Sequence, residues 1–223
     1  MACTALLTLS DEPIHHAAQD PAKNPERNYH VPAEGGRIFG EWYSIIAVAG
    51  GFGLYGIMAH DTAAKKISIE LFQAGLYSEI VTGILKTVVG RARPYMDKGP
   101  FYFKPFSVFN VDYNSFPSGH STSAFALSTV LFRHAHTVPL KILAFVPAGL
   151  TLFSRIYQDK HWVSDELLGA AIGFFVGNWV VDLHEAHRHR INVSVTSVYP
   201  PAVTIDLDAL LSGRHQVSDI KHR

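Results

Sequence analysis

The chain has 223 residues, enough for one domain with a sizeable core, and nothing in it indicates a second domain of comparable size. Its formal net charge is zero, so the composition does not favour binding to nucleic acid through bulk charge. The single cysteine, Cys3, excludes an internal disulfide framework. The hydrophobic content of 48% is high for a soluble enzyme and low for a bundle fully embedded in lipid.

The first 40 residues are polar and rich in proline and histidine. The apolar run at residues 2–9 has no basic flank and is too short for a secretion signal. We therefore expect residues 1–40 to form an extended polar arm, with at most a short helix.

Five apolar stretches predict the helices of a main domain at residues 41–190. They lie at residues 41–60, 67–85, 120–132, 138–153 and 165–183. The fifth carries Gly169, Gly173 and Gly177 at a four-residue spacing, which is typical of close helix packing. The sequence thus predicts an all-α fold, a helical bundle of about five core helices.

Two further segments differ from these helices. Residues 95–116 form a loop with many aromatic side chains, which either packs onto the end of the bundle or forms a substrate rim or membrane-dipping edge. Residues 191–223 alternate between apolar and polar side chains, which predicts a strand-like C-terminal tail.

The first candidate site stretch ends the second predicted helix. Lys86 and Arg93 are seven residues apart, close to two helical turns, so we expect both cations to leave the helix end on the same side. An ammonium and a guanidinium fork suit a tetrahedral oxyanion. Alone, this pair also fits an ordinary basic helix end.

The second stretch is Pro-Ser-Gly-His at residues 117–120, just before the third predicted helix. Unpaired N–H groups at a helix start attract anions. Gly119 allows a ligand to approach the backbone closely, Ser118 can donate its hydroxyl, and His120 can exchange a proton near neutral pH.

The third stretch contains Ser154, Arg155, His161 and Asp165. His161 and Asp165 are four residues apart, so at a helix start they share one face. A carboxylate that accepts a ring N–H orients the imidazole and makes its other nitrogen more basic. That arrangement suits a histidine nucleophile, although such a pair is also a common stabilising contact.

The order and spacing of these stretches carry more information than any one of them. Lys86 and Arg93-Pro94, then residues 117–120, then Ser154-Arg155, His161 and Asp165 form a tripartite signature. In this respect the chain resembles the type 2 phosphatidic acid phosphatases, which share a helical fold with vanadium haloperoxidases and bacterial acid phosphatases. The resemblance spans about residues 41–183.

The resemblance implies a metal-independent phosphatase acting on lipid or isoprenoid-carrier phosphates. It places the phosphoryl group among five residues: Lys86, Arg93, Ser118, Gly119 and Arg155. His161, held by Asp165, would attack phosphorus to form a phosphohistidine, and His120 would protonate the leaving oxygen.

Two other functions stay open at this stage. One is a non-specific acid phosphatase acting on soluble monoesters, and the other is a vanadate-dependent haloperoxidase using the same pocket. The family implies no required cofactor, with vanadate expected to bind as an inhibitor, or as the cofactor in the haloperoxidase case. The expected partners are a lipid or small phosphate ester and a membrane, without nucleic acid, and the sequence does not indicate an oligomeric state.

The distribution of basic residues bears on location. The end of the bundle away from the motifs holds six of them: Lys65, Lys66, Arg133, Lys141, Arg188 and Arg190. The positive-inside rule places such an end in the cytoplasm, so the expected location is a bacterial inner membrane with an outward-facing site. The alternative is a soluble or peripheral periplasmic enzyme whose secretion signal is missing from the start.

Overall fold

The computed structural model describes residues 8–20, 30–107 and 110–194. The chain divides into two compact units, Met1–Asp182 and Leu183–Arg223, and of the second only the last part of one helix is described. Across the described ranges the regular structure is helical, as the sequence predicts.

Four helices form the centre of the first unit. They are α4 (Trp42–Met58), α5 (Thr62–Val89), α6 (Gly119–His134) and α8 (Val163–Ser194). Their buried side chains meet in one apolar core, with Ile45 from α4, Leu71 from α5, Val130 from α6 and Val180 from α8. Burial of this core provides the main driving force for folding the bundle.

The helix α7 (Val138–Tyr157) packs against α6 on one side and against α3 (His30–Gly40) on the other. A shorter helix, α2 (Asp11–Gln19), also contacts α7. The expectation of an extended arm over residues 1–40 is therefore wrong for these segments, because two helices form there and pack onto the bundle. Residues 1–7 and 21–29 lie outside the described part.

Close packing of α8 against α6 confirms the interpretation of the glycine row. A Cβ added at Gly169 would lie 2.4 Å from the Ser118 carbonyl oxygen, and one added at Gly173 would lie 2.3 Å from the Thr122 carbonyl oxygen. Only residues without a Cβ allow the two backbones to approach this closely.

The C-terminal expectation is wrong where it can be compared. Helix α8 continues through Ser194, so residues 191–194 are helical rather than strand-like. The rest of the predicted tail lies outside the described residues.

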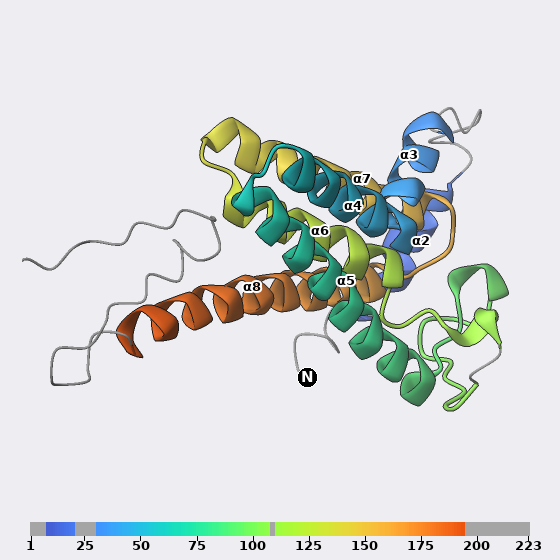
Figure 1. Ribbon diagram of the computed structural model, residues 1–223. Helices are drawn as coiled ribbons and strands as arrows, with labels where there is room; N and C mark the ends of the chain where they lie inside the picture. The colour runs from blue at the N-terminus through green and yellow to red at the C-terminus, as the bar shows by residue number, and fades with distance from the viewer. Residues whose placement is uncertain (1–7, 21–29, 108–109, 195–223) are drawn as a thin grey trace, which may run out of the picture. The chain divides into compact units, whose positions relative to one another are not determined.

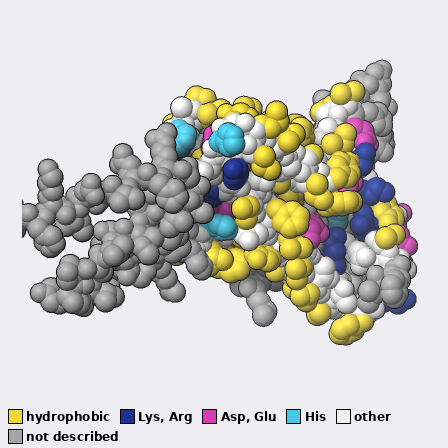
Figure 2. Space-filling view, viewed as in Figure 1, with side chains coloured by type: hydrophobic (Ala, Val, Ile, Leu, Met, Phe, Trp, Pro, Cys, Tyr) yellow, Lys and Arg dark blue, Asp and Glu magenta, His cyan; other side chains and the backbone are white. Residues whose placement is uncertain are grey.

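Many large apolar side chains are exposed on the surface of the bundle. Two described helices, α7 and the Val163–Ala186 part of α8, are long and apolar enough to cross a membrane, and α4 is a shorter apolar helix. Large side chains such as Ile57, Phe72 and Phe175 are more than half exposed. Figure 2 shows hydrophobic side chains spread along the helices of this face.

Candidate active site

The predicted site segments meet at one end of the bundle. Helices α5 and α7 end there, and α6 and α8 begin there, together with the loop between α5 and α6 (Figure 1). The loop contains two short 3-10 turns, η1 (Pro94–Met96) and η2 (Val111–Tyr113). This arrangement brings together segments that lie more than 70 residues apart in sequence.

Lys86 and Arg93 are placed by a helix end. Helix α5 stops at Gly90, which has a φ of 61°. A Cβ at Gly90 would lie 1.9 Å from the Lys104 carbonyl oxygen, so only glycine fits this turn. Arg93 therefore follows the helix instead of extending it, and the expectation that two helical turns align the cations is wrong. In the loop, the Arg93 Nε donates to the Val111 carbonyl at 3.0 Å.

The start of α6 faces the Lys86 ammonium. Ser118 is the N-cap, and its hydroxyl accepts the Ser121 N–H at 3.3 Å. A Cβ at Gly119 would lie 3.5 Å from the Lys86 Nζ, which itself donates to the Asn114 carbonyl at 3.2 Å. A helix N-terminus beside an ammonium is an electropositive, anion-attracting position.

Arg155 reaches the same place from the last turn of α7. Its side chain is buried, and its Nη1 lies 3.1 Å from the His120 Nε2. A second guanidinium nitrogen, Nη2, donates to Gln158. The Arg155 Nε is buried and has no hydrogen-bond partner among the described residues. A buried donor of this kind is costly unless a ligand satisfies it.

His161 lies in the turn between α7 and α8 and is 3% exposed. Its Nδ1 is 2.8 Å from the Ser115 carbonyl oxygen, so that nitrogen carries the proton and donates it. Its Nε2 is buried and has no hydrogen-bond partner in the described part of the chain. Burial, followed by the charges of Arg93 and Lys86, holds the pKa of His161 well below its usual value, so the ring is neutral with a free lone pair on Nε2.

Asp165 has a different partner from the one expected. Its Oδ2 is 3.8 Å from the His161 Nδ1, beyond hydrogen-bonding distance, and the Ser115 carbonyl takes the position predicted for the carboxylate. The Asp165 carboxylate instead accepts from Arg91 Nη1 at 2.6 Å, from the Ser115 hydroxyl at 2.5 Å and from the Trp162 N–H at 2.9 Å. Through these hydrogen bonds Asp165 holds the residues around His161 in place. Its carboxylate also adds a negative charge near the His161 ring.

His120, the second residue of α6, lies across from His161, with the ring centroids 6.5 Å apart. The carboxylate of Glu41 approaches its Nε2 at 3.3 Å, on the same side as Arg155. Burial, and next the charge of Arg155, lowers the pKa of His120 to about 2, so this ring too is neutral.

The structure adds residues that sequence reasoning missed. Ser115 orients His161, Arg91 holds Asp165, and Glu41 contacts His120. Arg91 stands two residues from Arg93, a proximity that marks it as a candidate, but a backbone carbonyl such as that of Ser115 has no side-chain signature. Glu41 is 79 positions from His120, so only the packing of α3 and α4 brings the two together.

The aromatic side chains of the loop between α5 and α6 are largely exposed. Phe101 is 61% exposed and Phe106 is 71% exposed, which favours a rim over a packed cover. Phe109, another aromatic residue of this loop, lies outside the described residues.

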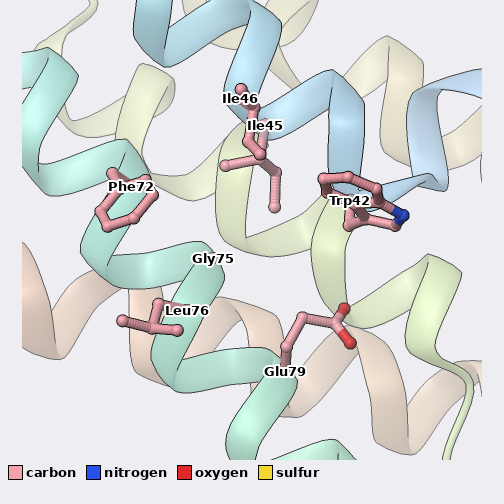
Figure 3. A pocket seen from close by; sticks show the side chains of 7 residues that line it. All are labelled: Trp42, Ile45, Ile46, Phe72, Gly75, Leu76 and Glu79. Carbon is pink, nitrogen blue, oxygen red and sulfur yellow. The ribbon is translucent and has the colours of Figure 1, made fainter.

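An apolar pocket of about 160 Å³ lies between α4 and α5 (Figure 3). Six of the seven residues that line it are uncharged, and Glu79 provides the only carboxylate. Figure 3 shows Trp42 and Glu79 on the same side of this pocket. Trp42 follows Glu41, which contacts His120, and Glu79 accepts from the Ser123 hydroxyl one turn after His120. The pocket therefore borders the cationic site.

The fold and the site together define a class of protein. It is a helical bundle that gathers three cations, a helix N-terminus and two neutral imidazoles at one end, a pocket suited to a tetrahedral anion. Among the described residues, no group of three or more His, Cys, Asp or Glu side chains is placed to hold a metal ion.

The chain belongs to the PAP2 superfamily, whose family model matches residues 69–189 and includes all three motif stretches. It is 36% identical over 113 residues to a lipid A 1-phosphatase of Rhizobium etli, covering 48% of this chain and 46% of that one. It is 31% identical over 121 residues to an undecaprenyl-diphosphatase of Sulfolobus acidocaldarius, covering 52% of each. The chain thus spans about half the length of these curated relatives.

A solved structure has the same fold. The PAP2-type phosphatidylglycerolphosphate phosphatase of Bacillus subtilis superposes with a TM-score of 0.56 at 21% identity, covering 83% of this chain and 94% of that one. This likeness supports the helical architecture described above.

Proposed function

We propose that this chain is a metal-independent phosphatase that hydrolyses lipid or isoprenoid-carrier phosphates through a phosphohistidine on His161. The observation that carries the proposal is the free, buried Nε2 of His161 in a pocket lined by cations. Relatives named as lipid A 1-phosphatase and undecaprenyl-diphosphatase support the lipid class.

Phosphate binding falls to the cations and the start of α6. Lys86, Arg93 and Arg155 neutralise the phosphoryl oxygens, and the unpartnered Arg155 Nε supplies one donor. The Gly119 N–H and the Ser118 hydroxyl add donors at the helix N-terminus. Stabilising charge on these oxygens is the main task in phosphoryl transfer, and here the charge comes from side chains.

In the first chemical step, the His161 Nε2 lone pair forms a bond to phosphorus as the bond to the ester oxygen breaks. The leaving oxygen keeps that electron pair and takes a proton from His120. Water then attacks phosphorus, the P–N bond returns its pair to His161, and His120 takes the proton of the water. The net reaction is hydrolysis of one phosphate ester bond.

The protonation of His120 is coupled to substrate binding. Burial and the surrounding cations keep the pKa of His120 low. A bound phosphate dianion offsets those cations, so the pKa of His120 rises when a substrate is present. His120 thus carries the proton when the leaving group needs it.

The substrate class rests on the pocket beside the cationic site. The apolar pocket between α4 and α5 borders the cationic site. This arrangement fits a lipid whose phosphate head group enters the cationic site and whose chain lies in the apolar pocket. The exposed apolar side chains of the bundle suit a membrane location.

The proposed orientation places the site on the outer side of the membrane. Basic residues at the opposite end, such as Lys65, Lys66 and Lys141, favour the cytoplasm for that end. In a Cys3→Ala background, a membrane-impermeant thiol reagent should label Lys104→Cys in intact cells and leave His136→Cys unlabelled. The reverse labelling would refute this orientation.

The decisive measurement is phosphate release by the purified full chain in detergent, with a chelator present. We expect a long-chain lipid phosphate to be hydrolysed in preference to a soluble aryl phosphate, and His161→Ala to lose more than about a thousandfold in kcat. His136→Ala, at an exposed loop histidine, serves as the matched control.

Three outcomes would contradict parts of the proposal. Near-normal activity of His161→Ala would exclude the phosphohistidine, and equal turnover of the soluble ester would favour an acid phosphatase. Activity only with added vanadate, bromide and peroxide would identify a haloperoxidase instead.

A further inference from the structure

Helix α2 lies outside the region that the family model matches, yet it is fastened to the segment around His161. Asp11, His15 and Gln19 follow one another at four-residue spacing, so they share one face of the helix. Each of them makes a hydrogen bond to residues 156–164.

Two of these bonds hold the chain before His161. The Gln19 Nε2 donates to the Ile156 carbonyl at 2.9 Å, at the end of α7. The His15 Nε2 lies 2.6 Å from the Asp159 Oδ1, and the His15 ring also packs against Trp162 with centroids 5.2 Å apart. Helix α2 therefore spans the turn that presents the nucleophile.

The third attachment lies just after His161, at the start of α8. The Asp11 Oδ1 accepts the Ser164 N–H at 2.8 Å, and its Oδ2 accepts the Ser164 hydroxyl at 2.5 Å. Ser164 is the second residue of α8, where backbone N–H groups have no partner within the helix. Asp11 thus acts as a capping residue supplied from 153 positions away.

Asp11 also belongs to a buried chain of charges. Its Oδ2 accepts from Arg91 Nη2 at 2.7 Å, while Arg91 Nη1 donates to Asp165 at 2.6 Å. All three side chains are at most 1% exposed. Burial raises the pKa of Asp165, while the charge of Arg91 opposes that rise. With both carboxylates ionised, the two carboxylates and one guanidinium carry a net charge of −1, whereas Arg91 with an ionised Asp165 alone would be neutral.

This net negative charge lies close to the His161 ring. Asp165 lies 3.8 Å from the His161 Nδ1, the ring nitrogen that keeps its proton when Nε2 is phosphorylated. The imidazole gains positive charge in that step, and a nearby negative charge buried from water stabilises it. Removing the charge of Asp11 would leave Arg91 to neutralise Asp165.

We propose that Asp11 is a positioning residue for the reaction at His161. From α2 it caps α8 and balances Arg91, so that Asp165 keeps both its place and its negative charge beside the histidine. The inference rests on the proposed function, because it takes His161 as the nucleophile.

The test is Asp11→Asn in the full chain, which keeps the shape and removes the charge. We expect kcat to fall by about ten- to a hundredfold, while KM and the Kd for vanadate stay within about twofold, because no phosphate-binding cation is changed. Glu12→Gln, an exposed carboxylate on the same helix, is the matched control and should behave as the wild type.

A double-mutant cycle separates this role from a general effect on folding. In an Asp165→Asn background, Asp11→Asn should cause no further loss of kcat, because the charge it supports is already gone. An equal loss in both backgrounds, or a loss of vanadate affinity that follows the fall in Tm, would overturn the proposal.

Ser164→Ala is the second variant, should Asp11→Asn fail to fold. It removes only the hydroxyl that Asp11 and Arg91 share, and a kcat loss of about three- to tenfold at unchanged KM is expected. Unchanged kcat would refute the inference. If His161→Ala is inactive while Asp11→Asn and Ser164→Ala match the wild type, this inference alone fails and the proposed function stands.

Discussion

Replacing Gly169 by alanine should damage catalysis through the backbone of the turn that we propose binds phosphate. The added Cβ would lie 2.4 Å from the Ser118 carbonyl oxygen, and an ordinary contact begins at 3.4 Å, so the two helices must separate by 3.4 − 2.4 = 1.0 Å. Ser118 caps α6 directly before Gly119 and His120, so the shift falls on the groups proposed to bind the phosphate and to protonate the leaving oxygen. A misplacement of about 1 Å costs about a hundredfold in rate.

Gly173→Ala is the matched control for this substitution. Its Cβ would meet the Thr122 carbonyl oxygen at 2.3 Å, a similar overlap placed one turn farther from the pocket. Both variants should lose about 1–3 kcal/mol of stability from overpacking. Gly149→Ala, on α7 in open space, should be neutral or slightly stabilising, because alanine favours helix more than glycine does.

The assay combines kcat on a lipid phosphate with thermal unfolding in detergent. We expect Gly169→Ala to lose about a hundredfold in kcat and Gly173→Ala to lose less than tenfold, at similar falls in Tm. If both lose activity equally, the effect comes from general distortion of the bundle. If Gly169→Ala keeps full activity, catalysis does not depend on the position of the start of α6.

Three further predictions follow from the site. Stability should fall between pH 7.5 and 5.5 by roughly 1 kcal/mol for each of His120 and His161, because the unfolded imidazole takes up a proton near pH 6.5 while the buried ring, whose pKa is lowered, does not. Denaturant titrations should show about half this slope in His120→Gln, and an unchanged slope would contradict the assignment. Gly40→Ala should lower kcat at least tenfold, because its Cβ would lie 2.7 Å from the His120 Cβ, and wild-type kcat would refute this contact. Phe72→Ala, in the lining of the apolar pocket, should raise KM several-fold for a long-chain phosphate but not for a short ester. The control is Phe175→Ala, an exposed position outside the pocket lining, and the same rise in KM there would argue against the pocket as the binding site for the lipid chain.

Much of the architecture could be predicted from apolar patterning. The five stretches predicted as helices correspond to α4 to α8, because a long apolar run must satisfy its own backbone hydrogen bonds, which a helix does within the segment. Helix ends were less predictable, since they depend on particular contacts. A glycine followed by a proline is a sequence signal for the end of α5, and Gly90 does close it. The close approach of the Lys104 backbone to Gly90, in contrast, exists only in the folded loop.

The polar start of the chain is where pattern reasoning failed most. Residues 1–40 contain prolines, histidines and charges, which favour an arm over packed helices. Asp11 is nevertheless fully buried, because Arg91 and the start of α8 supply partners that exist only in the folded chain. A buried charge is tolerated only when it is paired and hydrogen-bonded.

The sequence by itself determined which chemical groups the candidate site contains, because the motif spacing predicts that Lys86, Arg93, Arg155 and the two histidines act together. Only the tertiary structure decided how they are held, with the Ser115 carbonyl instead of Asp165 on the His161 ring, and with Asp165 braced by Arg91. The physical reason is that motif spacing records side chains close together in sequence, whereas the orientation of the proposed nucleophile depends on backbone atoms and buried charges that folding brings from elsewhere.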